Sequence, residues 1–138
     1  MPAMFKTVLF PIDQSRDARE AAEVVVDVVQ KYGSRLVLLS VVETADSDES
    51  PTDVMASPDA VAQLLQNAQS LFNQQGIETE TIEREGKPAF VICDVADEIG
   101  ANLIIMGCRG IGLTEEGLTD SVTNRVINLS PCPVMIVP

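Results

Sequence analysis

The chain contains no histidine and no tryptophan among its 138 residues. Without histidine it lacks the commonest general base, so neither a Ser-His-Asp nor a Cys-His mechanism can be written for it. Its three cysteines, Cys93, Cys108 and Cys132, form no Cys-x-x-Cys pair, which argues against a structural metal site or a disulfide framework. Aromatic residues make up only 4% of the chain, so the core must be built mainly from Val, Ile, Leu and Ala.

Basic residues are also scarce, because nine Lys and Arg against 21 Asp and Glu give a net charge of −12. Such a chain repels nucleic-acid phosphates and anionic lipid, so we expect neither a nucleic-acid nor a membrane partner. No apolar run approaches the roughly 20 residues that a spanning helix needs. Residues Met1 to Lys6 lack the basic and then apolar pattern of a secretory signal, and we therefore expect a cytoplasmic protein.

Short β-branched runs alternate with longer amphipathic segments along the chain. Strands are expected at residues 6–10, 36–42, 77–83, 102–106 and 134–137. Helices are expected from Ser15 to Gly33, from Pro58 to Gly76, from Pro88 to Ile99 and from Ser121 to Leu129. Five strands joined by four connections of crossover length predict an α/β fold, in which a parallel sheet carries helices on both faces.

The length of the chain fits one domain over residues 1–138. Residues 43–57 are acidic and rich in turn-forming residues, so we expect a mobile surface connection there that does not divide the domain. Residues 77–83 alternate small or apolar with charged side chains, which is typical of an edge strand with one face in water.

A glycine-rich segment follows the fourth expected strand. Residues Ile104 to Gly110 form an apolar run that leads into a loop, and residues 120–125 open the helix beyond it. A turn of this kind presents unpaired backbone N–H groups and the positive end of a helix dipole, which attract an anion such as a nucleotide phosphate. Ser121 and Thr123 can donate hydroxyl hydrogen bonds to that phosphate, or can equally cap the helix.

A second unusual loop, residues 11–15, follows the first expected strand. In open parallel sheets the ligand binds at the carboxyl ends of the strands where the winding reverses, so the two loops meet if the first and fourth strands are neighbours. Asp13 would then accept hydrogen bonds from ribose hydroxyls or from an adenine amino group. Its alternative role is to stabilise the dipole of the following helix. Arg109 and Lys87 are candidate cations for an anion, with solvated surface roles as the alternative.

Five motifs spread over residues 5–137 carry a resemblance to a known family. They are Val8–Ser15, Leu38–Val42, Glu85–Ala89, Ile105–Gly110 and Ser130–Val134. Together they resemble the universal stress proteins of the single-domain, nucleotide-binding type. The resemblance implies a three-layer, open, twisted sheet of five parallel strands ordered 3-2-1-4-5, and a stress-response regulatory or signalling protein that binds an adenine nucleotide.

The same resemblance implies the site residues. Pro11, Ile12, Asp13 and Val41 would surround adenine and ribose, Met106, Gly107, Arg109 and Gly110 would hold ribose and the first phosphates, and the terminal phosphates would meet Ser121, Val122 and Thr123. The implied ligand is ATP, ADP or AMP, with magnesium as a candidate counter-ion. The family commonly dimerises through its last strand, so we expect a homodimer through Val134 to Val137, an apolar edge that would otherwise invite association.

Asp120 departs from the phosphate motif of that family. The motif runs glycine, two residues, glycine, nine residues, glycine, then Ser or Thr, and Asp120 stands here in place of the third glycine, after Gly107 and Gly110. A carboxylate about 5 Å from a phosphate charge at an effective dielectric near 20 costs about 3 kcal/mol, on the order of a hundredfold in affinity. Asp120 can also cap the helix itself. We therefore expect a retained adenosine pocket with a weakened triphosphate site.

Three functions remain open from the sequence: a nucleotide-binding regulatory module, a nucleotide-free dimeric interaction protein and a slow ATP hydrolase. Asp13 with Gly107 and Gly110 favours binding, whereas Asp120 favours the interaction protein. Hydrolysis needs a group that activates water near the terminal phosphate; only loop acids are available for it, and we assign no catalytic residue. The chain also lacks the Gly-Lys-Ser or Gly-Lys-Thr of a P-loop kinase and the strand-end aspartate of a response-regulator receiver.

Overall fold

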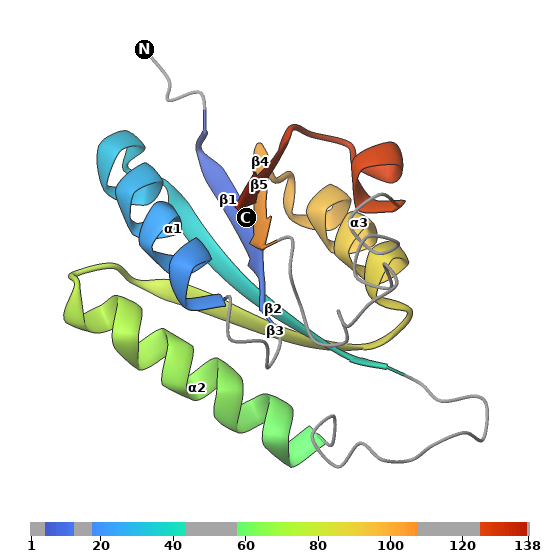
Figure 1. Cartoon of the computed structure of the whole chain (residues 1–138), viewed down its shortest axis with the longest axis horizontal. Coiled ribbons are helices and arrows are strands. Elements are labelled where there is room, and N and C mark those ends of the chain that lie inside the picture. The colour runs from blue at the N-terminus through green and yellow to red at the C-terminus, as the bar shows by residue number, and fades with distance from the viewer. Residues whose placement is uncertain (1–4, 13–17, 44–57, 108–124, 138) are drawn as a thin grey trace.

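The computed structural model describes residues 5–12, 18–43, 58–107 and 125–137, and shows a parallel sheet between two layers of helices (Figure 1). The strands are β1 (Thr7–Pro11), β2 (Arg35–Glu43), β3 (Thr79–Gly86), β4 (Leu103–Gly107) and β5 (Val134–Val137). The helices are α1 (Ala18–Tyr32), α2 (Pro58–Gln74) and α3 (Pro88–Ile99), and residues 125–129 are also helical. All neighbouring strands are parallel and their order is β3-β2-β1-β4-β5, which confirms the expected fold class and strand order.

The two faces of the sheet are covered by different helices. α1 and α2 lie on the face that carries Val8, Phe10 and Leu38, whereas α3 and the helix at residues 125–129 lie on the face that carries Leu9 and Val37 (Figure 1). Successive side chains of a strand point to opposite faces. Because both faces of the central strands are buried, these strands read in the sequence as nearly continuous apolar runs.

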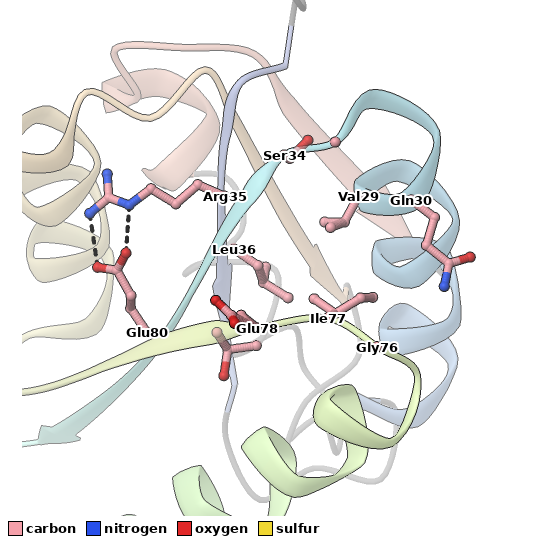
Figure 2. A pocket seen from close by; sticks show the side chains of 11 residues that line it. Val29, Gln30, Ser34, Arg35, Leu36, Gly76, Ile77, Glu78 and Glu80 are labelled. Carbon is pink, nitrogen blue, oxygen red and sulfur yellow. Dashed lines mark hydrogen bonds and ion pairs between the residues drawn. The ribbon is translucent and has the colours of Figure 1, made fainter.

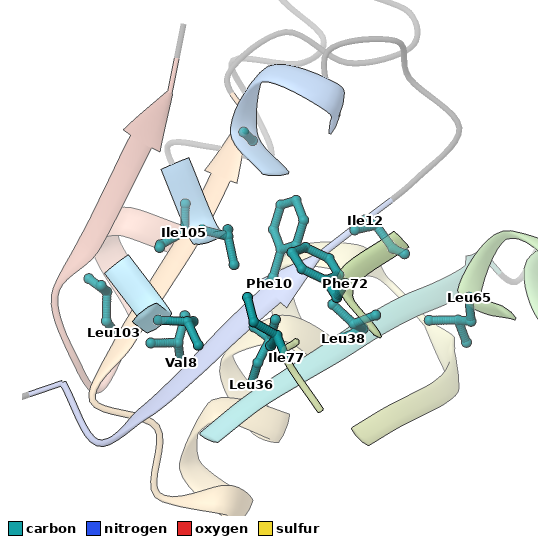
Figure 3. Packing of buried hydrophobic residues seen from close by; sticks show 13 residues of the cluster. Val8, Phe10, Ile12, Leu36, Leu38, Leu65, Phe72, Ile77, Leu103 and Ile105 are labelled. Carbon is teal, nitrogen blue, oxygen red and sulfur yellow. The ribbon is translucent and has the colours of Figure 1, made fainter. Parts of the chain in front are cut away.

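An aromatic pair joins α2 to the middle of the sheet (Figure 3). Phe72 of α2 lies against Phe10 of β1, with ring centroids 6.2 Å apart and ring planes at 89°. The two side chains are only 3% and 2% exposed. This edge-to-face arrangement is one that aromatic rings prefer, and it makes Phe72 the main aromatic anchor of α2.

The end of α2 differs from the sequence expectation, because β3 begins at Thr79 and not at Ile77. Gly76 has a φ of 81°, and its N–H donates to the Asn73 carbonyl at 2.9 Å. The N–H of Ile77 donates to the Phe72 carbonyl at 3.0 Å, which completes a Schellman motif. Ile77 therefore uses its backbone N–H to close the helix and buries its side chain in the core with Phe72, so the strand starts later.

Other sequence expectations about the sheet hold with small shifts. β3 is an edge strand as expected, with Glu80 and Glu83 exposed to solvent, but it continues to Gly86. β1 includes Pro11 as its last residue. Of the acidic connection expected at residues 43–57, only Glu43, the last residue of β2, is described; the other residues lie outside the described ranges.

Gly86 lies where β3 turns into α3. Its φ is 143°, and a Cβ placed there would lie 2.8 Å from Cγ2 of Val91. We expect Gly86→Ala to lower the free energy of unfolding by about 2–4 kcal/mol, because it adds backbone strain and a steric clash. Urea unfolding measures the loss. The double variant Gly86→Ala/Val91→Ala should relieve the clash but not the strain, whereas wild-type stability of Gly86→Ala would contradict this account.

Candidate functional site

The carboxyl ends of β1 and β4 lie side by side. Val8 pairs with Leu103 and Leu9 pairs with Ile104, and the same register carried forward places Pro11 beside Met106. From β1 the chain continues to α1 on one face of the sheet, and from β4 it continues to the helix at residues 125–129 on the other face (Figure 1). The winding therefore reverses between these strands, which is where ligands bind in open α/β sheets.

Five predicted site residues lie at this carboxyl edge within the described ranges. Ile12 is buried on the face of α1 and α2, and its N–H donates to the Leu39 carbonyl at 2.8 Å. Met106 is buried in the core on the face of α3, and Val41 is half-buried against the same core. Pro11 ends β1 and Gly107 ends β4, and both residues are half-buried. The structure thus brings three strands to one edge and supplies apolar side chains from both faces.

The other predicted site residues lie outside the described ranges. They are Asp13, Arg109, Gly110, Asp120, Ser121, Val122 and Thr123. The described residues that flank their loops are Ile12 and Gly107 at the carboxyl edge, and Arg125 at the start of the described part of the fourth helix. The roles of these seven residues therefore stay predictions.

Ser40 is a buried polar residue near this edge that was not among the predicted site residues. It is 2% exposed, and strand alternation places it on the same face as Leu38 and Ile12. Because Leu39 pairs with Pro11, Ser40 lies next to Ile12, the residue that precedes Asp13. The sequence signal that could have identified Ser40 is its hydroxyl group within the otherwise apolar run of β2. A buried polar group generally has a specific hydrogen-bond partner, so such a residue merits attention.

Asn102 aligns β1 with β4 at the opposite end of both strands. Its Oδ1 accepts a hydrogen bond from the Thr7 N–H at 2.9 Å, and its own N–H donates to the Thr7 carbonyl at 2.8 Å. We expect Asn102→Ala to lower the free energy of unfolding by about 1–3 kcal/mol, because the N–H of the buried residue Thr7 loses its acceptor. Thermal or urea unfolding measures the loss.

The matched control for Asn102→Ala is Asn128→Ala, because Asn128 is exposed on the helix at residues 125–129. Its stability should stay within about 0.5 kcal/mol of wild type. Equal stability of the two variants would show that the Asn102 side chain does not align the strands.

Two exposed ion pairs lie among the described residues, near the β3 margin. Arg35 contacts Glu80 at 2.7 Å and Arg84 contacts Glu98 at 2.8 Å. The hydrogen bonds from each arginine hold the pKa of the partner carboxyl below its usual value. Arg84 lies opposite Val41, but Glu98 of α3 already engages its guanidinium. Exposed pairs of this kind contribute little to stability.

The thiols of Cys93 and Cys132 lie in or against the core on the face of α3. Burial raises the pKa of both thiols, so they stay protonated and react slowly. Among the described residues, no group of three or more His, Cys, Asp or Glu is arranged to hold a metal ion. Of the helices that the structure describes, none is both long and apolar enough to cross a membrane.

A pocket of about 490 Å³ lies at the opposite, amino end of the sheet (Figure 2). It forms where α1 ends and β2 and β3 begin, with Val29, Leu36 and Ile77 as its apolar lining and with Gln30 and Glu78 among its polar lining. It contains none of the predicted site residues. Since ligands of such sheets bind at the carboxyl ends of the strands, this pocket is separate from the candidate nucleotide site.

Comparison with known proteins identifies the family of the chain. A model of the universal stress protein family matches residues 4–138. The chain belongs to the universal stress protein family. Within this family, a universal stress protein from Synechocystis is 61% identical over 136 residues, which cover 98% of this chain and 87% of that protein.

Solved structures of universal stress proteins share the fold. UspA from Lactobacillus plantarum has a TM-score of 0.79 at 25% identity, covering 97% of this chain and 98% of that one. A universal stress protein in complex with cAMP has a TM-score of 0.77 at 21% identity, with 99% of each chain covered. An Arabidopsis thaliana member with AMP bound has a TM-score of 0.71 at 21% identity, covering 96% and 90%. At these identities the last two comparisons establish the fold alone.

Proposed function

We propose that this universal stress protein is a cytoplasmic stress-response regulatory or signalling protein that binds an adenine nucleotide at the carboxyl ends of β1 and β4. The observation that carries the proposal is the adjacency of these two strands at the reversal of the winding. Two further facts support it: the family of the chain, and the adenine nucleotides held by two proteins of the same fold.

In the proposed site, apolar contacts come from described residues and polar contacts from the two loops. Val41 and Met106 lie on the face of α3 and would pack against the base and ribose, with Pro11 and Ile12 at the end of β1. A flat purine gains affinity from burial between such side chains. Asp13 would accept hydrogen bonds from ribose or adenine.

The phosphates of the nucleotide would bind along the chain segment that begins at Gly107. Gly107, Arg109 and Gly110 would hold the ribose and the first phosphates, and Ser121, Val122 and Thr123 the terminal ones. Asp120 adds a negative charge at the terminal position, so AMP and ADP should bind better relative to ATP than they would with glycine there. Magnesium or Arg109 would offset part of this repulsion.

Calorimetric titration with ATP, ADP and AMP, with and without magnesium, tests the proposal. We expect saturable heat with at least AMP, and a loss of affinity of about tenfold or more in Asp13→Asn, because a charged hydrogen-bond acceptor is removed. Asp27→Asn is the matched control, because Asp27 is exposed on α1. No heat with any nucleotide would overturn the proposal and favour the nucleotide-free interaction protein.

A homodimer through β5 is the second part of the proposal. β5 is an edge strand of four apolar residues, all half-buried, and Ile127 and Leu129 of the helix that precedes it in the chain are exposed. An apolar edge strand is a template for pairing with another chain. Sedimentation should show dimers that the variant Ile136→Lys converts to monomers, whereas dimers unchanged by Ile136→Lys would contradict pairing through β5.

A further inference from the structure

The exposed side chains described on α2, from Ala62 to Gln74, carry no charge, and the one acidic residue of the helix is Asp59 in its first turn. Charged residues make up 22% of the sequence, yet residues 60–77 contain no Asp, Glu, Lys or Arg. The other long helices expose charged side chains, including Glu23 and Asp27 on α1 and Asp94 and Asp97 on α3. Because Glu and Lys are as favourable in helices as Gln, helix formation alone does not explain an uncharged face.

Six of the exposed side chains of α2 form one polar strip, which we call the amide face. It consists of Gln63, Gln66, Asn67, Ser70, Leu71 and Gln74. Helical spacing places this strip away from the buried residues Leu65 and Phe72. Leu71 is 59% exposed, more than any other large hydrophobic side chain in the described part of the chain.

The fold uses an inner amide of α2 but not the amide face. Gln69 donates from Nε2 to the Thr79 carbonyl at 3.0 Å and so joins α2 to β3. On the outer side, Gln63 donates to Asn67 Oδ1 at 3.3 Å, a bond within the helix between two exposed residues. The amide face therefore lies outside the packing of α2 on the sheet, and its exposed Leu71 is accessible to a partner.

We propose that the amide face binds the amide face of a second copy of this chain, as an antiparallel helix pair about a two-fold axis. Two copies with a net charge of −12 repel each other through their charged surfaces, and a neutral face lets them approach. An amide group both donates and accepts hydrogen bonds, so a row of amides is complementary to itself across a two-fold axis. Leu71 of each copy supplies the apolar contact.

The position of α2 makes this contact independent of pairing through β5. α2 lies over β2 and β3 at one margin of the sheet, and β5 forms the other margin (Figure 1). Both surfaces can therefore be used at once. Two different two-fold contacts produce a closed tetramer if their axes meet, and an open assembly if they do not.

Analytical ultracentrifugation of the full chain tests the proposal. We expect concentration-dependent association that strengthens from about 0.05 to 0.5 M salt, because salt screens the repulsion between acidic copies. Leu71→Glu should weaken this association by about tenfold or more, since it removes the apolar contact and places like charges opposite each other. Ile136→Lys, which tests β5, should leave the α2 contact intact.

Phe90→Glu is the matched control, because Phe90 is 48% exposed on α3, on the other face of the sheet, and receives the same new charge. It should associate like wild type, and circular dichroism should show that both variants are folded. The proposal would be overturned if the wild-type protein stayed monomeric up to about 1 mM, a concentration at which even weak contacts are detected. It would also be overturned if Phe90→Glu weakened association as much as Leu71→Glu does. Association that Leu71→Glu leaves unchanged would overturn it too, and would assign the amide face to a different partner.

Discussion

Replacing Asp120 with glycine is expected to raise the affinity for ATP relative to AMP by up to about a hundredfold. The reason is electrostatic, since the carboxylate stands at the position of the family motif where glycine precedes the Ser or Thr for the terminal phosphates. AMP has no phosphate at that position, so its affinity should change little. Calorimetric titration of both nucleotides with both proteins measures the ratio.

Asp120→Asn separates charge from backbone freedom. Asparagine removes the negative charge but keeps the size of the side chain and its ability to cap a helix. If the charge of Asp120 weakens ATP binding, Asp120→Asn should recover most of the gain expected with glycine. If the ratio of ATP to AMP affinity stays at its wild-type value in both variants, the repulsion argument is wrong.

Phe72→Ala should lower the free energy of unfolding by about 3–5 kcal/mol, the usual cost of removing a buried phenylalanine. Its ring is 3% exposed and lies edge-to-face against Phe10, so its loss leaves a cavity between α2 and the sheet. Urea unfolding at low protein concentration measures the change without a contribution from self-association.

Leu71→Ala is the matched control for Phe72→Ala, because the two residues are adjacent on α2 but differ in exposure, 59% against 3%. Its stability should lie within about 0.5 kcal/mol of wild type. The two neighbours thus separate two roles of one helix: Phe72 holds α2 on the sheet, and Leu71 serves the proposed contact between copies. Similar losses in both variants would mean that α2 is not packed as described.

Much of the fold was predictable because its signals are local. The buried strands appear in the sequence as apolar runs, such as Leu36–Leu39. Because both faces of such a strand are buried, nearly all its residues are apolar, and the run can be recognised without knowing which strands are its neighbours. Gly33 and Gly76 end helices in the structure as expected, and Gly100 follows the end of α3 at Ile99, each with a positive φ. Edge and central strands also differ visibly, since the charged residues of β3 alternate with less polar ones.

The error at the start of β3 shows where local signals conflict. Ile77 has high strand propensity, but Gly76 in a left-handed conformation directs the Ile77 N–H to the Phe72 carbonyl. One N–H cannot serve both the helix end and a strand ladder. Tertiary packing decided the competition, because the Ile77 side chain joins the same core as Phe72.

The candidate site divides in the same way. The sequence indicated which segments form the candidate site: the loop after Phe10, the glycines after Met106 and the acidic residue at position 120. The resemblance to the family supplied the roles of these residues. The sequence alone left open whether the two loops meet, and the resemblance supplied the strand order. Only the tertiary structure showed Ser40 buried next to Ile12, and Val41 and Met106 on one face.

Helix ends and strand periodicity depend on residues that lie a few positions apart in the chain, so the sequence alone is sufficient to predict them. The adjacency of β1 and β4 is different, because it rests on contacts such as that of Thr7 with Asn102, 95 residues away along the chain. No local preference specifies such a pair. It forms together with the whole core, in which α1 and α2 on one face and α3 on the other bury the apolar strands in this order.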